Sequence, residues 1–206
     1  MADIVIKVGG SLQKGNNLPA ICRQLAFLTV QHRVIIIPGG GIFADAVREC
    51  ARIFNLNQET SHWMAILAMN QYGYLLSSLI PGSICTDNID EGKKRANKFQ
   101  PAVFLPYLLL KNKDPLPHSW DVTSDSIAAW ITGYIGVKKL VLIKSKNLPS
   151  DEYADHDFRS PLDTDQLQKS EMVDPMFCGI MKNIKADLWV INGNKPEQLN
   201  CLLSIT

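Results

Sequence analysis

The sequence predicts an α/β protein with a mostly parallel central sheet. Apolar runs of strand length alternate with segments of helical periodicity along the 206 residues, a pattern typical of α/β folds. The runs at 4–8, 34–37 and 138–144 contain consecutive apolar residues, as expected for strands that are covered on both faces of a parallel sheet. The run at 4–8 leads directly into glycines, and the run at 34–37 does so after Pro38; glycines suit the tight turns between a strand and the following helix.

The first part of the chain is expected to contain two strands and three helices. Their ranges in chain order are 4–8 (strand), 18–30 (helix), 34–37 (strand), 42–54 (helix) and 59–80 (helix). In the first helix, Ile21 and Leu25 lie on one apolar stripe. Thr60 or Ser61 is the expected N-cap of the long third helix, which ends before Pro81.

The second part of the chain has a less regular pattern. The expected elements are 102–105 and 107–110 (strands interrupted by Pro106), 121–136 (helix), 138–144 (strand), 175–185 (short helix), 188–192 (strand) and 196–203 (helix). Residues 112–119 are expected to form a loop, and 150–169 a polar excursion on the surface. Since no linker or internal repeat interrupts the pattern, we expect a single domain.

The composition indicates a folded globular chain and excludes two classes of partner. Hydrophobic residues make up 46%, charged residues 20%, and the formal net charge is +1. So small a charge provides no strong field for nucleic acid or an anionic membrane, so neither is an expected partner. The five cysteines form no C-x-x-C pair, which argues against a zinc cluster or a disulfide framework. With no signal-peptide features and no membrane-spanning apolar run, a soluble cytoplasmic protein is expected.

The two glycine turns are candidate phosphate-binding sites. Gly9 and Gly10 follow the first strand, and Gly39, Gly40 and Gly41 follow the second. Ligands of open parallel sheets bind beyond the carboxyl ends of the strands, where glycines let backbone N–H groups approach an anion closely. Lys7, just before the first turn, can place a cation on a transferring phosphoryl group. The alternative is two ordinary turns, because neither has the spacing of a Walker A loop or a dinucleotide fingerprint.

Two carboxylates flank a predicted helix start. Asp121 and Asp125 lie on either side of Thr123 and Ser124, either of which is a suitable N-cap. A carboxylate in the first turn of a helix is favoured by the helix dipole and stays ionised, so it is a poor proton acceptor. Asp125 is therefore expected to orient lysines or a metal ion, with capping alone as the alternative.

Three segments together resemble the amino-acid kinase superfamily. They are "KVGGS" at the end of the first strand, "PGGG" at the end of the second, and "DVTSDSIA" at the start of a late helix. The resemblance implies a three-layer αβα sandwich in which ATP, with Mg²⁺, donates its γ-phosphoryl group to an acidic oxygen of a small molecule. It also implies a homo-oligomer and one domain over 1–206, with an acceptor-binding lobe at about 1–120 and a nucleotide-binding lobe at about 121–206.

The resemblance further implies roles for individual residues. Lys7 would stabilise the transferring phosphoryl group, and Asp125 would organise the lysines around it. The glycine turns would hold the two substrates: Gly9, Gly10 and Ser11 the ATP phosphates, and Gly39, Gly40 and Gly41 the acceptor. No residue is assigned as a metal ligand.

Two departures from the family pattern leave one role open. The nucleotide loop of the family often has the sequence T-D-V-D-G, whereas this chain has "LIKSKNLP" at 142–149, in which Lys144 and Lys146 are candidate nucleotide contacts. A Gly-Gly-Met element that usually precedes a second catalytic lysine is absent. Lys182 or Lys185 is expected to supply that lysine, with Lys182 as the residue assigned here, and Lys144 competes for the role.

Softer similarities point to one branch of the superfamily. The compact length, "HWMAILAMNQYGYLL" and the ending "VDPMF…WVINGNKPEQL" are similar to small kinases of methanofuran biosynthesis, which phosphorylate an aminomethylfuran-methyl phosphate to its diphosphate. A phosphate acceptor is already an anion, so such an enzyme must align it and neutralise charge, and needs no general base.

Four side chains are candidates for binding this acceptor. Asp45 and Arg48 share one face of the helix after Gly41, so Asp45 is expected to bind the substrate ammonium and Arg48 its phosphate. The alternative is an exposed ion pair within the helix. His62 and Asp121 are the other two candidates, although a lone histidine on an apolar face is commonly a core residue.

Two other functions stay open. The chain could be a kinase for another small phosphate or carboxylate, such as isopentenyl phosphate, or a non-catalytic protein of the same fold that binds nucleotides or oxyanions. An amine-binding Asp45 favours the aminated acceptor over an isoprenoid. The altered nucleotide loop and the absent Gly-Gly-Met element keep the non-catalytic function in consideration.

Overall fold

The computed structural model describes residues 2–145, 164, 167 and 171–204. Lys146 and most of the polar segment expected at 150–169 lie outside these residues.

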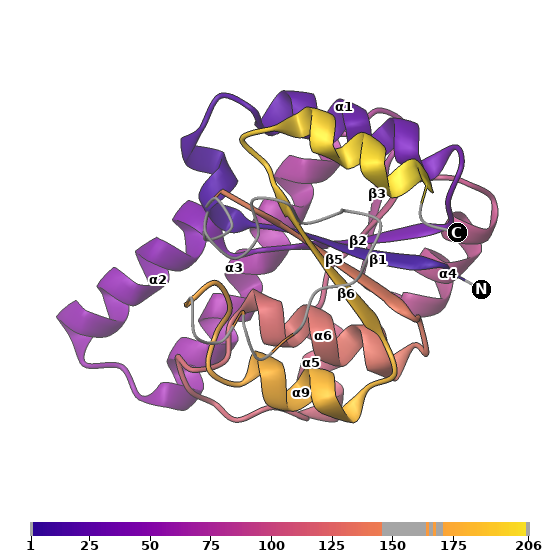
Figure 1. Ribbon diagram of the computed structural model, residues 1–206. Helices are drawn as coiled ribbons and strands as arrows, with labels where there is room; N and C mark the ends of the chain where they lie inside the picture. Colours follow the sequence, from indigo (N-terminus) through magenta and orange to yellow (C-terminus); the bar gives the residue numbers. More distant parts are fainter. Residues whose placement is uncertain (1, 146–163, 165–166, 168–170, 205–206) are drawn as a thin grey trace.

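One sheet organises the described part of the chain. Its six strands are all parallel, in the order β3-β4-β2-β1-β5-β6. In chain order the strands are β1 (Ile4–Val8), β2 (Val34–Pro38), β3 (Ile84–Thr86), β4 (Ala102–Phe104), β5 (Lys139–Lys144) and β6 (Asp187–Asn192). The α/β class and the parallel sheet are thus confirmed, with β1 between β2 and β5 at the centre (Figure 1).

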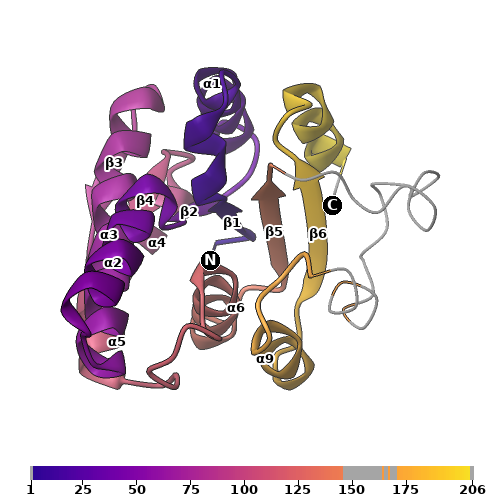
Figure 2. The same cartoon turned by 90° about the vertical axis from the view of Figure 1, so that its left-hand side faces the viewer.

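Helices cover both faces of this sheet and give the expected three-layer αβα sandwich (Figures 1 and 2). One face carries α1 (Leu18–Thr29) and the 3-10 helix η2 (Pro196–Ser204), and the opposite face carries α6 (Ser124–Tyr134) and α9 (Phe177–Asn183). The other helical elements are η1 (Gly10–Lys14), α2 (Gly41–Phe54), α3 (Gln58–Leu79), α4 (Ile89–Asn97) and α5 (Tyr107–Lys113).

Each central strand contributes to two cores, because successive strand residues point to opposite faces of a sheet. Ile6 of β1 packs in the core beneath α1, whereas Val5 packs in the core beneath α6 and α9. The long helix α3 takes part in both: Met69 packs on the α6 side and Tyr72 on the α1 side. α3 therefore passes along the part of the sheet formed by β2, β4 and β3.

The three central strands end at one level. Val8 at the end of β1 pairs with Pro38 of β2 and with Ile143 of β5. Since parallel strands run in the same direction, the segments that follow them emerge at one edge of the sheet. This is the edge at which open α/β sheets bind ligands.

Two expectations about local structure were wrong. Residues 107–110 do not form a strand but the start of α5, because Pro106, which cannot continue a central strand, is well suited to a helix start. The N-cap of α3 is Asn57, not Thr60 or Ser61, and its side chain accepts the Thr60 N–H at 2.7 Å. The strand β3 and the helix α4 were not expected, and the segment at 196–203 forms a 3-10 helix.

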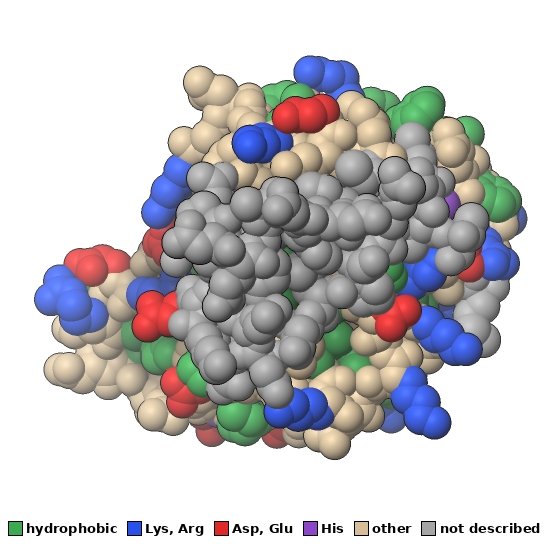
Figure 3. Space-filling view, in the orientation of Figure 1, with side chains coloured by type: hydrophobic (Ala, Val, Ile, Leu, Met, Phe, Trp, Pro, Cys, Tyr) green, Lys and Arg blue, Asp and Glu red, His purple; other side chains and the backbone are tan. Residues whose placement is uncertain are grey.

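The visible surface carries interspersed charge. On the face shown in Figure 3, both acidic and basic side chains appear around the rim, in keeping with a net charge of +1. Among the described helices, none has the length and apolar character needed to cross a bilayer.

Candidate active site

The turns that follow β1 and β2 meet backbone to backbone. A Cβ added to Gly10 would lie 2.0 Å from the nitrogen of Gly41, and one added to Gly39 would lie 2.5 Å from the nitrogen of Gly10. The Gly39 N–H donates to the Val8 carbonyl at 2.8 Å, and Gly41 has φ +57, a conformation that favours glycine. Any larger residue at Gly10 would push the two turns apart.

The first turn is also attached to β5 and α3. The Gly9 N–H donates to the Ile143 carbonyl at 2.8 Å, and the Tyr72 hydroxyl donates to the Gly9 carbonyl at 3.3 Å. The hydroxyls of Ser11 and Ser145 are hydrogen-bonded at 2.7 Å. The ends of β1, β2 and β5 thus form one connected surface of backbone and hydroxyl groups.

A buried carboxylate holds two lysines beside this surface. Asp125, in the first turn of α6, accepts a hydrogen bond on Oδ1 from Lys7 Nζ at 2.8 Å, and a second on Oδ2 from Lys144 Nζ. Lys7 and Asp125 are each only 3% exposed. Lys7 pairs in register with Leu142 of β5, so Lys144, two residues further on, faces the same side of the sheet.

The pKa values in this cluster reflect burial opposed by charge. Burial lowers the pKa of Lys7, the charge of Lys144 lowers it further, and the charges of Asp125 and Asp174 act in the opposite direction. Burial alone would raise the pKa of Asp125, but the charges and hydrogen bonds of the two lysines outweigh it and hold that pKa below its usual value. Asp125 is therefore ionised at neutral pH and orients cations rather than accepting a proton.

A second carboxylate, Asp174, holds the start of α6. Thr123 is the N-cap, and its hydroxyl accepts the Asp125 N–H at 3.4 Å. Asp174 Oδ2 accepts hydrogen bonds from the Thr123 N–H at 3.0 Å, the Thr123 hydroxyl at 2.7 Å and the Ser126 N–H at 3.1 Å, and Oδ1 accepts one from the Ser126 hydroxyl. Asp174 was not among the predicted site residues, because its only signal in the sequence is an isolated aspartate before a proline.

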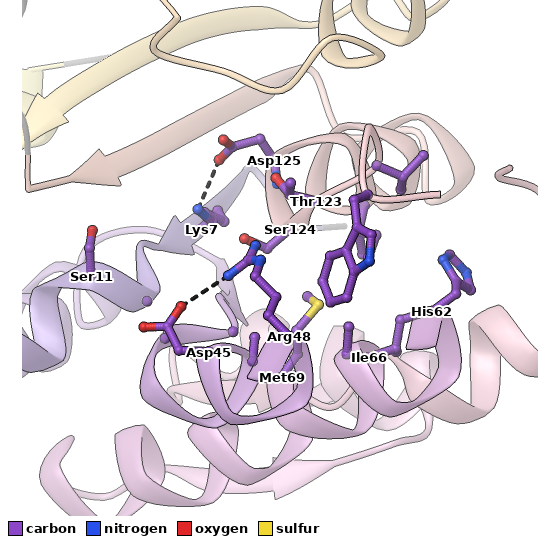
Figure 4. Close-up of a pocket in the computed structure, with 18 of the residues that line it drawn as sticks. Lys7, Ser11, Asp45, Arg48, His62, Ile66, Met69, Thr123, Ser124 and Asp125 are labelled. Atoms are coloured by element: carbon purple, nitrogen blue, oxygen red, sulfur yellow. Dashed lines mark hydrogen bonds and ion pairs between the residues drawn. The ribbon is translucent and has the colours of Figure 1, made fainter. Parts of the chain in front are cut away.

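The lysines and the glycine turns face a cavity of about 280 Å³ (Figure 4). Lys7, Lys144 and Asp125 lie at one end of its lining, beside Gly40 and Gly41. Its apolar side is formed by Ile66 and Met69 of α3 together with Val122 and Ile127. The cavity thus combines a cationic end with an apolar wall, a combination that suits a small molecule carrying an anionic group.

The predicted acceptor residues of α2 line the cavity, but they are already paired. Asp45 Oδ2 lies 2.9 Å from Lys14 Nζ, and Asp45 Oδ1 accepts a hydrogen bond from Arg48 at 3.0 Å (Figure 4). The Arg48 guanidinium also lies over the Trp120 ring, 4.9 Å from its centroid. The side chains of Asp45 and Arg48 are about half exposed.

His62 lines the same cavity from α3. Its ring stacks on that of His118 at 4.5 Å, and His118 Nε2 is 2.7 Å from Asp114 Oδ1. Burial, with smaller contributions from His118 and Lys111 against the opposing effect of Asp114, lowers the pKa of His62 from 6.5 to about 4. His62 is therefore uncharged at neutral pH.

Five predicted site residues are not placed in the cavity lining. Gly9 and Gly39 belong to the two glycine turns but do not line the cavity. Lys182 lies on α9 and Asp121 is exposed, and neither lines the cavity. Lys146 is outside the described residues. Within the described ranges, no group of three or more His, Cys, Asp or Glu side chains is arranged to hold a metal ion.

Comparisons with known proteins agree with this architecture. "[5-(aminomethyl)furan-3-yl]methyl phosphate kinase" from Methanocaldococcus jannaschii is 27% identical over 202 residues, covering 97% of this chain and 92% of the relative. Uridylate kinase from Archaeoglobus fulgidus has a similar structure, with a TM-score of 0.69 at 17% identity over 97% of this chain and 96% of its own. UMP kinase from Ureaplasma parvum gives a TM-score of 0.68 at 16% identity, over 100% of this chain and 96% of its own. At such identities the two structures show a shared fold.

The family assignment rests on the sequence itself. The sequence model of the group described as "Amino acid kinase family" matches residues 4–147, which is more than half of the 206 residues. The match includes both glycine turns, Lys7, Asp125 and Lys144. The chain therefore belongs to the amino acid kinase family.

Proposed function

We propose that this protein is an ATP-dependent kinase whose acceptor is the phosphate group of a small molecule. The observation that carries the proposal is the Lys7–Asp125–Lys144 cluster beside the joined glycine turns. Two lysines held by one carboxylate can neutralise charge on a phosphoryl group in transit, and closely packed turns can position donor and acceptor on either side of it.

In the proposed reaction, an oxygen of the acceptor phosphate attacks the γ-phosphorus of ATP. The bond between that phosphorus and the oxygen bridging to the β-phosphate breaks, and ADP leaves with the bonding electrons. The acceptor oxygen is already ionised, so no proton has to be removed. Gly9, Gly10 and Ser11 would hold the ATP phosphates, and Gly39, Gly40 and Gly41 the acceptor phosphate.

Lys144 is the second lysine in this proposal. It shares the Asp125 carboxylate with Lys7 and lines the cavity, whereas Lys182 does not line it. As the transferring group becomes flat and its charge spreads over three oxygens, a cation from β1 and another from β5 would approach it from two directions. Asp125 would keep both lysines in place before the substrates bind.

Magnesium would accompany ATP, as is usual for kinases, and would supply screening of the β- and γ-phosphate charge. This ion commonly binds through substrate phosphates and water with one or two protein oxygens. Ser11, which lines the cavity, and Ser145, whose hydroxyl is hydrogen-bonded to that of Ser11, would supply protein oxygens for such an ion.

An aminomethylfuran-methyl phosphate is the acceptor we propose, with its diphosphate as the product in methanofuran biosynthesis. The Methanocaldococcus relative bears the name of such a kinase and aligns over 97% of this chain. The apolar wall of Ile66, Met69 and Val122 suits an uncharged ring, and Asp45 at the cavity lining is a partner for the amine.

An ADP-release assay against a panel of small acceptors tests the proposal. The panel contains the aminated furan phosphate, the same phosphate without its amine, isopentenyl phosphate and UMP, each with ATP and Mg²⁺. We expect ADP formation with the aminated furan phosphate at the highest kcat/KM. Preferential turnover of isopentenyl phosphate or UMP would contradict the acceptor, and tight ATP binding without ADP release for any of the four would favour a non-catalytic binder.

A further inference from the structure

Asp174 is a buried carboxylate whose charge acts on Lys7 and to which the proposed mechanism gives no role. It lies just before α9 and is 7% exposed. Its carboxylate accepts four hydrogen bonds, all from Thr123 and Ser126. These two residues stand on either side of Asp125 in the chain, so Asp174 holds the turn of α6 from which the Asp125 carboxylate extends.

In this arrangement Asp174 bonds the start of α6, and Asp125 bonds the two lysines. The orphan N–H groups at the start of a helix attract a nearby carboxylate, and without Asp174 the side chain of Asp125 would be the acidic group best placed to bond them. Because Asp174 accepts the Ser126 N–H and the Thr123 N–H, both oxygens of Asp125 are available to Lys7 and Lys144.

Asp174 also adds a second negative charge that acts on Lys7. Lys7 and Lys144 carry two positive charges, and Asp125 supplies one negative charge. The charged groups that bear on Lys7 are Asp125 from α6, Lys144 from β5 and Asp174 from the segment before α9. Removing a charge from a buried group of ions is costly for the remaining ones.

We propose that Asp174 is a positioning residue that holds the first turn of α6 in place and supplies the second negative charge of the lysine cluster. It acts through Asp125 and Lys7 and does not touch the substrate. The role in catalysis rests on the proposed kinase function, whereas the charge balance does not.

The test compares a neutral replacement with a replacement that removes only a hydrogen bond. Asp174→Asn removes the charge and keeps an oxygen that can accept the backbone N–H groups. Ser126→Ala removes one hydrogen bond to Asp174 and leaves every charge. Asp187→Asn, at the exposed start of β6, makes the same chemical change away from the cluster and serves as the control.

Two readouts are measured for each variant. The first is the titration of the Lys7 side-chain ammonium by NMR, which requires no activity. The second is the alkaline limb of the pH profile of kcat with ATP and the best acceptor of the panel. Loss of the Asp174 charge makes protonated Lys7 less stable, so in Asp174→Asn both the Lys7 titration and the alkaline limb should move to lower pH. We expect kcat to fall about 10–100-fold, the size of loss seen when a residue that orients the ligands of a metal site is replaced.

Ser126→Ala should unfold at a lower temperature but titrate as the unaltered protein does, and Asp187→Asn should match the unaltered protein in both readouts. If Asp174→Asn lowers only the melting temperature, or if Ser126→Ala shifts the titration equally, Asp174 is a structural residue and the proposal is wrong. Asp174→Ser, a second neutral variant that can still cap the helix, replaces Asp174→Asn if the latter does not fold. Failure of both to fold while Ser126→Ala folds also contradicts the proposal.

The two readouts separate this inference from the proposed function. If Asp174→Asn shifts the Lys7 titration but none of the acceptors in the panel gives ADP release, the result would contradict the kinase function and support the charge balance. If the protein is an active kinase and Asp174→Asn leaves the Lys7 titration unchanged, the result would support the kinase function and contradict the charge balance.

Discussion

Gly10 packs directly against Gly41, with 2.0 Å between the nitrogen of Gly41 and the position that a Cβ on Gly10 would take. The contact joins the turn after β1 to the turn after β2. In the proposed reaction these turns hold the donor and the acceptor, so this one backbone contact would set the distance over which the phosphoryl group travels.

Gly10→Ala should therefore impair both stability and catalysis. The atoms in the way belong to backbone and cannot rotate aside, so we expect a loss of about 1–3 kcal/mol in the free energy of unfolding, as for overpacked sites, together with a lower kcat. Gly179→Ala is the matched control, since a Cβ there meets no atom within 4 Å and alanine favours the helix α9 by roughly 0.5–1 kcal/mol. Urea unfolding and ADP release measure the two effects. If Gly10→Ala and Gly179→Ala have the same free energy of unfolding and the same kcat, the two turns can move apart without loss of stability or catalysis.

A comparison of Lys144→Gln with Lys182→Gln identifies the second lysine. Lys144→Gln should lower kcat by about 100-fold, the loss typical of one group that stabilises transition-state charge. Lys182→Gln should retain most of the activity, because Lys182 does not line the cavity. Initial rates at saturating ATP and acceptor give the result. A larger loss in Lys182→Gln would return the role to α9.

Much of this site could be predicted from local sequence patterns. The glycines after β1 and β2, the lysine before the first turn and the carboxylate at the start of α6 are each short-range signals, and parallel strand order then brings them to one edge of the sheet. The run at 107–110 was assigned wrongly because periodicity alone does not distinguish a strand from a helix in so short an apolar run.

The partners of Asp125 and of α6 depend on contacts between distant segments. Lys144 reaches Asp125 only because β5 lies next to β1. No local sequence pattern distinguishes Lys144 from several other lysines of the chain. Asp174 contacts a helix start 48 residues earlier. No periodicity or local motif records such a contact, so the sequence pattern could not identify it.

Asp45 offers a test of amine recognition. It is about half exposed and already paired with Lys14 and Arg48, so an added substrate ammonium would gain only a modest interaction. We expect Asp45→Asn to raise KM for the aminated furan phosphate by no more than about 5-fold, which corresponds to roughly 1 kcal/mol for an exposed ion pair. KM for the same phosphate without its amine is the control and should change less. An unchanged KM for the aminated acceptor would remove Asp45 from the acceptor site.

His62 should make the stability of the fold sensitive to mild acid. Its pKa is lowered from 6.5 to about 4 by burial, with His118 and Lys111 acting in the same direction and Asp114 against them. Between these two values the unfolded chain binds a proton that the folded chain does not, so the free energy of unfolding should fall as the pH drops from 6.5 to 4. In His62→Gln this part of the decrease, on the order of 1–3 kcal/mol, should be missing. Urea unfolding of both proteins between about pH 4 and pH 8 measures it. Above pH 6.5 the two curves should run parallel, because His62 is then neutral in both states, and parallel curves over the whole range would contradict the burial argument.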